Sequence, residues 1–195
     1  MNRMIIIIIT IAGFLNAEEN LQLDFPAFEE FTLDNGVNVL IAEHHEQPAA
    51  FFNIRIDIGG LDVPFGKEGL NEVAFDLLKK GTEKYTADEL SAIIDATGGR
   101  ISTASQLEYS TIKAQFLKED IDLGLNLIAE ILLRPTFPEN EYKLAIKQYK
   151  EGVKTWYSDP GSVASAHANK LLYGDSPMGN QMTQNSLKSL SLNDV

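Results

Sequence analysis

The sequence predicts an α+β domain in which an antiparallel sheet carries its helices on one face. Two observations predict this class. Apolar residues alternate with period two in some stretches, as in strands, and recur every three to four residues in others, as in amphipathic helices. The strands come in antiparallel groups and the helices are collected between and after these groups. This order favours a sheet with helices on one face over an alternating parallel fold.

The strand signals are local and specific. The predicted strands are residues 28–33, 37–43, 50–58, 100–105 and 108–117. Asn35-Gly36 lies between the first two strands and supplies the positive φ angles of a tight hairpin turn. Every second residue from Phe52 to Ile58 is apolar, so the third strand packs on one side only. The last two strands form a second antiparallel pair.

The helix signals combine apolar periodicity with caps. The predicted helices are residues 70–80, 87–97, 120–133, 139–157 and 160–173. Apolar residues recur at i, i+3, i+4, i+7 and i+8 from Leu70, and Gly81 ends this helix. Thr86 and Glu89 have the spacing of a capping box that opens the second helix. Asp159 stands as the cap before a proline in the first turn of the last helix.

The N-terminus carries an export signal. Residues 1–17 are predicted to be a secretory signal peptide, because Arg3 precedes an apolar run and Ala17 is a small residue at the expected cleavage position. An uncleaved membrane anchor is the alternative, but the run is shorter than the roughly 20 residues that span a bilayer. We therefore expect a periplasmic or secreted protein that does not associate with a membrane after cleavage.

The rest of the chain is expected to form one folded domain. Residues 18–30 are an N-terminal extension and residues 31–195 are the domain, without a linker or an internal repeat. Ser191 and Asp194 have the spacing of a helix start with no helix behind it, and a lone first turn is not stable. The sequence therefore predicts a domain that is truncated at its C-terminus.

Charge and cysteine content exclude several classes of function. The formal net charge is -12, which disfavours binding to nucleic acid and to anionic membranes. The chain has no cysteine, so disulfides and thiolate chemistry are excluded. The 195 residues, 44% of them hydrophobic, suffice to bury one substantial core.

Residues 69–82 resemble the zinc-binding helix of the insulinase/pitrilysin and mitochondrial-processing-peptidase family. That helix begins at a glycine, carries H-x-x-E-H and ends in Gly-Thr, which match Gly69 and Gly81-Thr82. Further blocks agree in order and spacing: the Asn-Gly hairpin, Gly59-Gly60, Gly98-Gly99 and residues 133–138, 158–160 and 171–179. The resemblance covers roughly residues 31–195. It implies the N-terminal domain of a zinc metallopeptidase fold.

The resemblance also implies that the catalytic groups are lost. Aligned on the same glycines, the two zinc histidines fall on Glu72 and Asp76, and the catalytic glutamate falls on Phe75. The third ligand, a glutamate in the long helix, falls on Glu151 or Gly152. Carboxylates in place of imidazoles suit Ca²⁺ or Mg²⁺ better than zinc. A phenyl ring cannot accept a proton from water, so we expect no catalytic residue and no zinc in this chain.

Helical geometry predicts the surroundings of these positions. At 100° per residue, Glu72, Phe75, Asp76 and Lys79 share the face opposite the apolar stripe. We expect this face to be an ordinary exposed polar surface with one aromatic residue, and a hard-metal site is the alternative. In the long helix, the aromatic positions that include Tyr149 are expected to pack in a core or against another domain.

The histidines offer no other metal site. His44 and His45 are neighbours in a strand and point to opposite faces, and His167 belongs to a later helix. Each histidine is therefore expected to be a surface residue.

These observations lead to one functional hypothesis and two alternatives. The leading hypothesis is a non-catalytic subunit that pairs with an active metallopeptidase, which would carry the intact H-x-x-E-H and the zinc, and that helps to bind unfolded peptides. Residues 52–60 end at a glycine pair and are expected to accept extended chain as an added strand. The alternatives are a stand-alone peptide-binding or chaperone-like module, and a metallopeptidase with an unconventional metal site.

Overall fold

The computed structural model describes residues 26–195. The chain divides into two compact units, the first ending at Gln47 and the second running from Pro48 to Val195. The predicted signal peptide, residues 1–17, and most of the predicted extension lie outside the described residues.

The first unit contains an antiparallel hairpin. Strand β1 (Phe28–Thr32) pairs with β2 (Asn38–Ala42). The turn between them closes through a hydrogen bond from the Gly36 amide to the Leu33 carbonyl oxygen, at 2.8 Å. Gly36 has a φ of 86°, a region that glycine occupies without strain. The hairpin predicted from Asn-Gly is confirmed.

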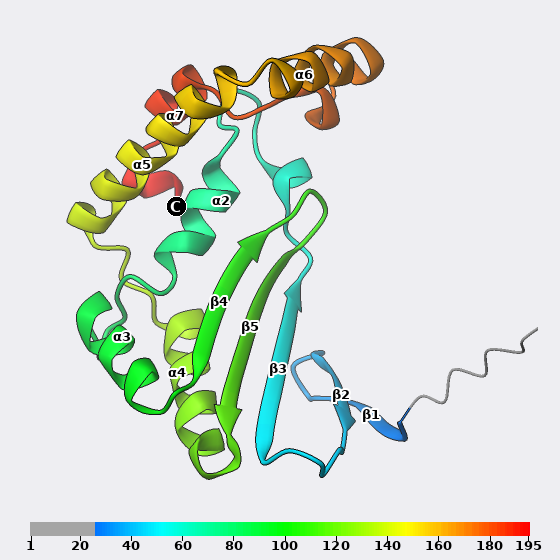
Figure 1. Cartoon of the computed structure of the whole chain (residues 1–195), viewed down its shortest axis with the longest axis vertical. Helices are drawn as coiled ribbons and strands as arrows, with labels where there is room; N and C mark the ends of the chain where they lie inside the picture. Colours follow the sequence, from blue (N-terminus) through cyan, green and yellow to red (C-terminus); the bar gives the residue numbers. More distant parts are fainter. Residues whose placement is uncertain (1–25) are drawn as a thin grey trace, which may run out of the picture. The chain divides into compact units, whose positions relative to one another are not determined.

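The second unit contains a three-stranded antiparallel sheet. Its strands are β3 (Ala49–Ile56), β4 (Arg100–Ser105) and β5 (Ser110–Leu117). Their order is β3-β5-β4, so β5 is the central strand and pairs with both neighbours, as Figure 1 shows. All three strands and the β4–β5 pair agree with the prediction.

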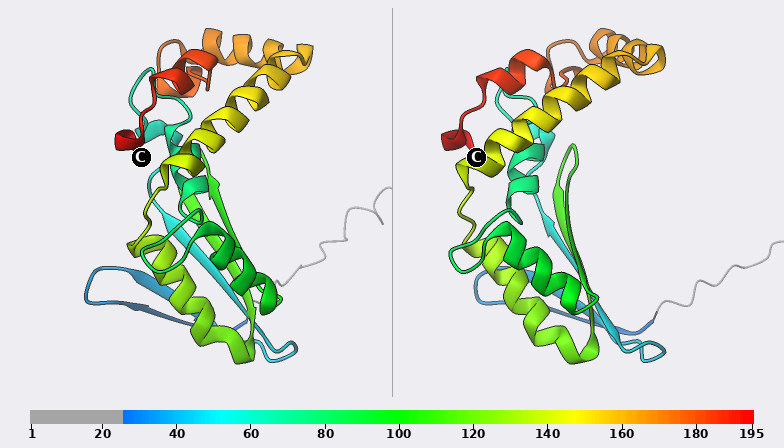
Figure 2. Two further views of the ribbon diagram at one scale, coloured as in Figure 1. Left: turned by 90° about the vertical axis from the view of Figure 1, so that its left-hand side faces the viewer. Right: turned by 60° about the vertical axis from the view of Figure 1, so that its left-hand side comes forward.

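Helices α3 (Ala87–Ala96) and α4 (Ile121–Leu133) cover one face of this sheet (Figure 2). The side chains buried between them form what we call the sheet cluster: Leu90, Ile101, Ile112, Ala114, Phe116, Leu127, Ile128 and Ile131. The Phe116 ring lies so close to two glycines that a Cβ would come within 2.5 Å of it at Gly99 and 2.4 Å at Gly124. The predicted α+β class is therefore confirmed.

The remaining helices pack together away from this cluster. They are α2 (Leu70–Leu77), α5 (Glu139–Tyr157), α6 (Pro160–Tyr173) and α7 (Gln184–Ser189). The side chains enclosed by α2, α5 and α7 form what we call the helix cluster: Val73, Leu77, Ala145, Val153, Leu187 and Leu190. Helix α6 buries no residue.

The predicted caps account for the helix ends. The Thr86 amide donates to Glu89 Oε2 at 2.8 Å, and the Glu89 amide donates back to the Thr86 hydroxyl oxygen. Asp159 accepts from the Ser162 amide at 2.7 Å. Helix α5 has the predicted bounds. Helix α7 was not predicted, although Thr183 caps it by accepting from the Ser186 amide at 3.0 Å.

Short 3₁₀ turns complete the second unit. They are η1 (Gly60–Asp62), η2 (Lys118–Asp120), η3 (Pro177–Gly179) and η4 (Leu192–Asp194). The helix start predicted at Ser191 is the single turn η4. Asp194 of this turn forms an ion pair with Lys67. Among residues 26–195, no helix is both long and apolar enough to cross a membrane.

Candidate functional site

Helix α2, which carries the degenerate zinc motif, is packed on more than one side. Gly69 precedes it with a φ of 104°, in space so tight that a Cβ would lie 3.0 Å from the Met182 side chain. Val73 and Leu77 are fully buried in the helix cluster. The helix contacts α5 on one side and β4 on another.

The side of α2 near the sheet is closed by hydrogen bonds. The Asn71 amide group donates to the Ser105 hydroxyl at 2.6 Å and to the Ser110 hydroxyl at 2.9 Å. Ser110 in turn donates to the Ile58 carbonyl oxygen at 2.8 Å. This polar chain joins α2 to β4, to β5 and to the end of β3, and Asn71 is only 5% exposed.

Phe75 lies one turn after Asn71 and is also buried, with 9% of its surface exposed. The prediction that it stands on an open polar surface is therefore wrong. A helix that packs on one side buries one stripe, whereas α2 packs against both α5 and the sheet and buries a wider arc. The ring at the predicted general-base position belongs to the interior of the unit.

Glu72 and Asp76 lie half-buried beside α5. The Tyr149 hydroxyl of α5 donates to Asp76 Oδ2 at 2.7 Å and lies 3.2 Å from the Glu72 carbonyl oxygen. Burial first, then the hydrogen bond to Asp76 and the nearby negative charges, raises the pKa of Tyr149 above its usual range. Tyr149 is therefore a neutral hydrogen-bond donor at ordinary pH.

The Glu72 side chain is less well satisfied. Its Oε2 atom is buried and has no hydrogen-bond partner within the described residues. Lys79, which was expected on the same face, is half-buried and forms no ion pair in that part of the chain. An unpaired buried carboxylate oxygen costs free energy, so the Glu72 side chain does not contribute to holding α2 in place.

The two candidates for the third ligand lie elsewhere on α5. Glu151 is exposed and its Oε1 accepts from Lys154 at 2.6 Å. It follows Tyr149 by two residues, about 200° around the helix. Gly152 is exposed, and a Cβ built on it meets nothing within 4 Å. The structure thus brings Glu72, Asp76 and Tyr149 together and leaves Glu151 outside.

This donor set does not fit a catalytic zinc ion. Zinc hydrolases use imidazole nitrogens with at most a minority of carboxylates, and they keep one position open for water. Here one Asp76 oxygen is occupied by the Tyr149 hydroxyl, and the one histidine of the second unit, His167, is exposed on α6. Among residues 26–195, no group of at least three His, Cys, Asp or Glu side chains could hold a metal ion.

The histidines are surface residues, as predicted. His44 and His45 belong to the first unit and lie in the loop after β2, not in a strand as predicted, with 63% and 84% of their side chains exposed and a glutamate of the same loop near each. His167 is exposed on α6.

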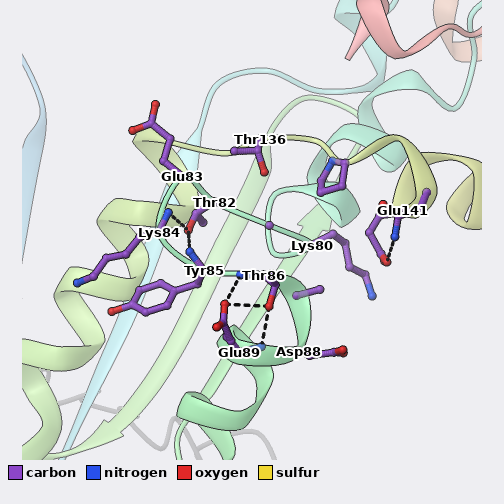
Figure 3. Close-up of a pocket in the computed structure, with 14 residues that line it drawn as sticks. Lys80, Thr82, Glu83, Lys84, Tyr85, Thr86, Asp88, Glu89, Thr136 and Glu141 are labelled. Atoms are coloured by element: carbon purple, nitrogen blue, oxygen red, sulfur yellow. Dashed lines mark hydrogen bonds between the residues drawn. The ribbon is translucent and has the colours of Figure 1, made fainter.

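The part of the chain that the structure describes also contains a shallow pocket of about 450 Å³ (Figure 3). Residues 80–89 line it from one side, with Thr136, Pro138, Asn140 and Glu141 on the other. Polar groups in the wall of this pocket are already hydrogen-bonded to each other. The Tyr85 amide donates to the Thr82 hydroxyl at 3.0 Å, and Thr86 and Glu89 form the capping box of α3. None of Glu72, Phe75, Asp76 or Tyr149 lines this pocket.

Tyr149 is the site residue whose role the sequence did not reveal. It was expected to be a packing residue, and a signal for more was available. Ala145, Tyr149 and Val153 form an i, i+4, i+8 stripe on α5, and a buried tyrosine hydroxyl requires a partner. The identity of that partner depends on the way α5 crosses α2, which no local pattern encodes.

Comparisons with known proteins agree with this geometry. The family model described as Insulinase (Peptidase family M16) matches residues 38–186. An uncharacterized zinc protease of Bacillus subtilis is 23% identical over 151 residues, which are 77% of this chain and 37% of that protein. A non-peptidase homolog of Helicobacter pylori is 23% identical over 161 residues, 82% of this chain and 37% of that protein.

A solved structure has the same fold. The inactive peptidase domain from Pseudomonas fluorescens superposes with a TM-score of 0.80 at 19% identity, over 86% of this chain and 42% of that chain. The chain spans 37% of the length of the two curated relatives. Their names include both a zinc protease and a non-peptidase homolog. The resemblance inferred from the glycine-framed helix is confirmed, and the chain belongs to the insulinase family of peptidases.

Proposed function

We propose that the chain is an exported, non-catalytic member of this family that pairs with an active metallopeptidase and helps to bind unfolded peptides. One observation carries the proposal. Phe75, aligned with the family's general base, is buried in the wall between α2 and its neighbours. A general base must lie within about 2.6–3.2 Å of the water that it deprotonates, and a phenyl ring has no atom that accepts a proton.

The neighbouring acids do not replace the missing base. Asp76 accepts a hydrogen bond from Tyr149, and Glu72 is held against α5 without a cation beside it. Hydrolysis in this family requires a metal that acidifies water, and two carboxylates with a tyrosine hydroxyl are a poor site for zinc. Zinc and the intact H-x-x-E-H are therefore assigned to the partner subunit.

The scaffold supports a role in binding. The sheet cluster and the helix cluster are both built from buried apolar side chains. Within the second unit, β3 and β4 each pair on one side only, so each has a free edge. A peptide added as a strand to such an edge gains main-chain hydrogen bonds without sequence specificity. In this proposal residues 31–195 form the binding domain and residues 18–30 are an extension.

The localisation part of the proposal depends on the N-terminal sequence. The export signal in residues 1–17 directs the chain to the periplasm or the cell exterior. Mass spectrometry of the N-terminus of the exported chain tests this. A mature N-terminus near Glu18 is expected, and an intact Met1 in a membrane fraction would contradict it.

Co-purification with an active family member of the same organism tests the pairing. We expect a stable complex in which the partner's hydrolysis of unfolded peptides increases. The control is a partner whose H-x-x-E-H glutamate is replaced, which should bind this chain and hydrolyse nothing. Recovery of the chain only as a monomer, with no change in the partner's activity, would contradict the proposal.

A further inference from the structure

The second unit leaves one face of its sheet uncovered by its own helices. Helices α3 and α4 pack on the face that carries Ile101, Ile112 and Phe116 (Figure 2). On the opposite face Phe51 is 67% exposed and Leu117 is 45% exposed. This face therefore presents several exposed side chains at alternate strand positions, although Thr111 is buried.

The strand register places cations diagonally across this open face. Phe51 on β3, Gln115 on β5 and Arg100 on β4 form one cross-strand row. The next row is Asn53, Lys113 and Ser102, and the third is Arg55, Thr111 and Ala104. Arg100, Lys113 and Arg55 thus occupy successive rows on successive strands, which we call the cationic diagonal.

Two members of the cationic diagonal, Lys113 and Arg100, are not neutralised by their neighbours. Lys113 lies between Asn53 and Ser102, which are uncharged, and Arg100 lies opposite Gln115. Within the described residues, neither Lys113 nor Arg100 forms an ion pair, and both are exposed.

Arg55 is the member of the cationic diagonal that already interacts with side chains of this chain. Its Nε donates to Asp57 at 2.9 Å, and its guanidinium lies 4.0 Å from the centre of the Tyr109 ring. With 59% of the side chain exposed, its remaining N–H groups stay available to a ligand.

The spacing of the diagonal specifies a ligand. Diagonal neighbours in an antiparallel sheet lie about 7–8 Å apart. Alternate side chains of an extended peptide are about 6.6–7 Å apart, because each residue advances about 3.3 Å. Carboxylates at positions i, i+2 and i+4 of an extended segment would therefore reach the three cations together. The chain as a whole carries a net charge of -12, so a cationic face is unusual for this surface.

We propose that the open face of the β3-β5-β4 sheet binds extended polypeptide with acidic side chains at alternate positions. The proposal rests on the proposed peptide-binding function and names the class of peptide. The exposed Phe51 ring belongs to the same cross-strand row as Arg100, on the other side of β5, and offers an apolar contact beside the diagonal.

Fluorescence anisotropy with the full chain and labelled ten-residue peptides tests the proposal. One peptide alternates glutamate with threonine, a second alternates lysine with threonine, and a third has the same glutamates in one block. The alternating acidic peptide is expected to bind at least about tenfold more tightly than the basic one at low salt, and to lose this advantage at high salt. The block peptide should bind more weakly than the alternating one.

Charge reversal on the diagonal provides the matched comparison. Lys113→Glu and, separately, Arg100→Glu should each weaken binding of the alternating acidic peptide by at least about fivefold. Lys147→Glu makes the same charge change on an exposed position of α5 and should alter binding less than about twofold. Unchanged circular dichroism confirms folding of each variant.

The outcomes separate this inference from the proposed function. Equal binding of acidic and basic peptides overturns the charge specificity and leaves peptide binding intact. Binding of neither peptide overturns both. Self-association that Lys113→Glu abolishes would identify a second copy as the occupant. Binding of an oligonucleotide in preference to the acidic peptide would replace polypeptide by nucleic acid. Either of these last two results also overturns the inference.

Discussion

The sheet cluster and the helix cluster differ in the kind of interaction that completes them. The sheet cluster is closed by apolar contacts, with Phe116 filling the space over Gly99 and Gly124. The helix cluster is bordered by side-chain hydrogen bonds. The Tyr149 hydroxyl joins α5 to α2, and the Ser186 hydroxyl donates to the Glu68 carbonyl oxygen at 2.8 Å. Glu72 and Asp76, which stand at the zinc-ligand positions of the resemblance, lie at the border of the helix cluster. A substitution there changes the polar groups but leaves the buried apolar side chains in place.

This difference shows how α2 is held with Glu72 and Asp76 at the positions that the resemblance assigns to the zinc histidines. Val73 and Leu77 anchor α2 by apolar packing in the helix cluster, and this packing involves no metal ligand. The Tyr149 hydroxyl bridges the same pair of helices, α2 and α5, from which the family resemblance draws its zinc ligands. In this chain the contact between the two helices is made by a hydrogen bond together with apolar packing.

The largest effect is expected in the sheet cluster. Phe116→Ala should lower the free energy of unfolding by about 3–5 kcal/mol, because it empties a fully buried site that α4 and the sheet cannot refill. Phe51→Ala, on the open face of the same sheet, should cost less than about 0.5 kcal/mol. Urea unfolding followed by circular dichroism measures both. Similar losses for the two variants would show that the sheet cluster is not the core.

A smaller effect is expected at the border of the helix cluster. Tyr149→Phe should lower the free energy of unfolding by about 1–3 kcal/mol, because Asp76 loses its donor in a half-buried place. Tyr157→Phe removes a hydroxyl from an exposed tyrosine of the same helix and should have no measurable effect. If both variants are equally stable, the hydrogen bond from Tyr149 to Asp76 does not stabilise the contact between α2 and α5.

The same bridge should be visible at alkaline pH. Since the folded-state pKa of Tyr149 is raised, its contribution to stability is fully present below the unfolded pKa of about 10 and is lost as the pH rises further. Ultraviolet titration of phenolate should show that the part of the signal due to Tyr149 appears above the usual tyrosine range of about pH 10. The difference is obtained by subtracting Tyr149→Phe. A Tyr149 signal within the usual tyrosine range would contradict its buried, hydrogen-bonded state.

The smallest effect is expected at the C-terminal turn. The ion pair with Lys67, followed by the hydrogen bonds from Ser191, lowers the pKa of Asp194 to about 2. A lowered pKa stabilises the fold above the unfolded value near 4, and this contribution is lost as the pH falls through about 2. The stability difference between the chain and Asp194→Asn should therefore be constant above about pH 4 and should vanish near pH 2. A difference that does not change over this range would exclude the ion pair as its source.

Local signals predicted most of the fold. Asn35-Gly36 determined the hairpin, the Thr86 capping box opened α3, and the prolines and Asp159 bounded α5 and α6. These features depend on residues a few positions apart, so a single sequence contains them. Helix α7 was missed because its six residues carry little periodicity of their own.

The sequence named the candidate site residues but did not predict their surroundings. Glu72, Phe75 and Asp76 were singled out, but Phe75 was placed on an exposed face. Its burial depends on β4 and α5 enclosing α2 from two sides, and the partner of Tyr149 lies 73 residues away in sequence. Contacts of that range follow from the packing of whole elements, which helical periodicity does not encode.

The most direct test of the account is peptide hydrolysis by the purified chain without a companion subunit. Unfolded peptide is incubated with the chain and Zn²⁺, with and without a chelator, and products are quantified by mass spectrometry. With a buried phenyl ring at the predicted general-base position, we expect no hydrolysis above the buffer control under either condition. Chelator-sensitive hydrolysis that disappears in Glu72→Ala would contradict the account.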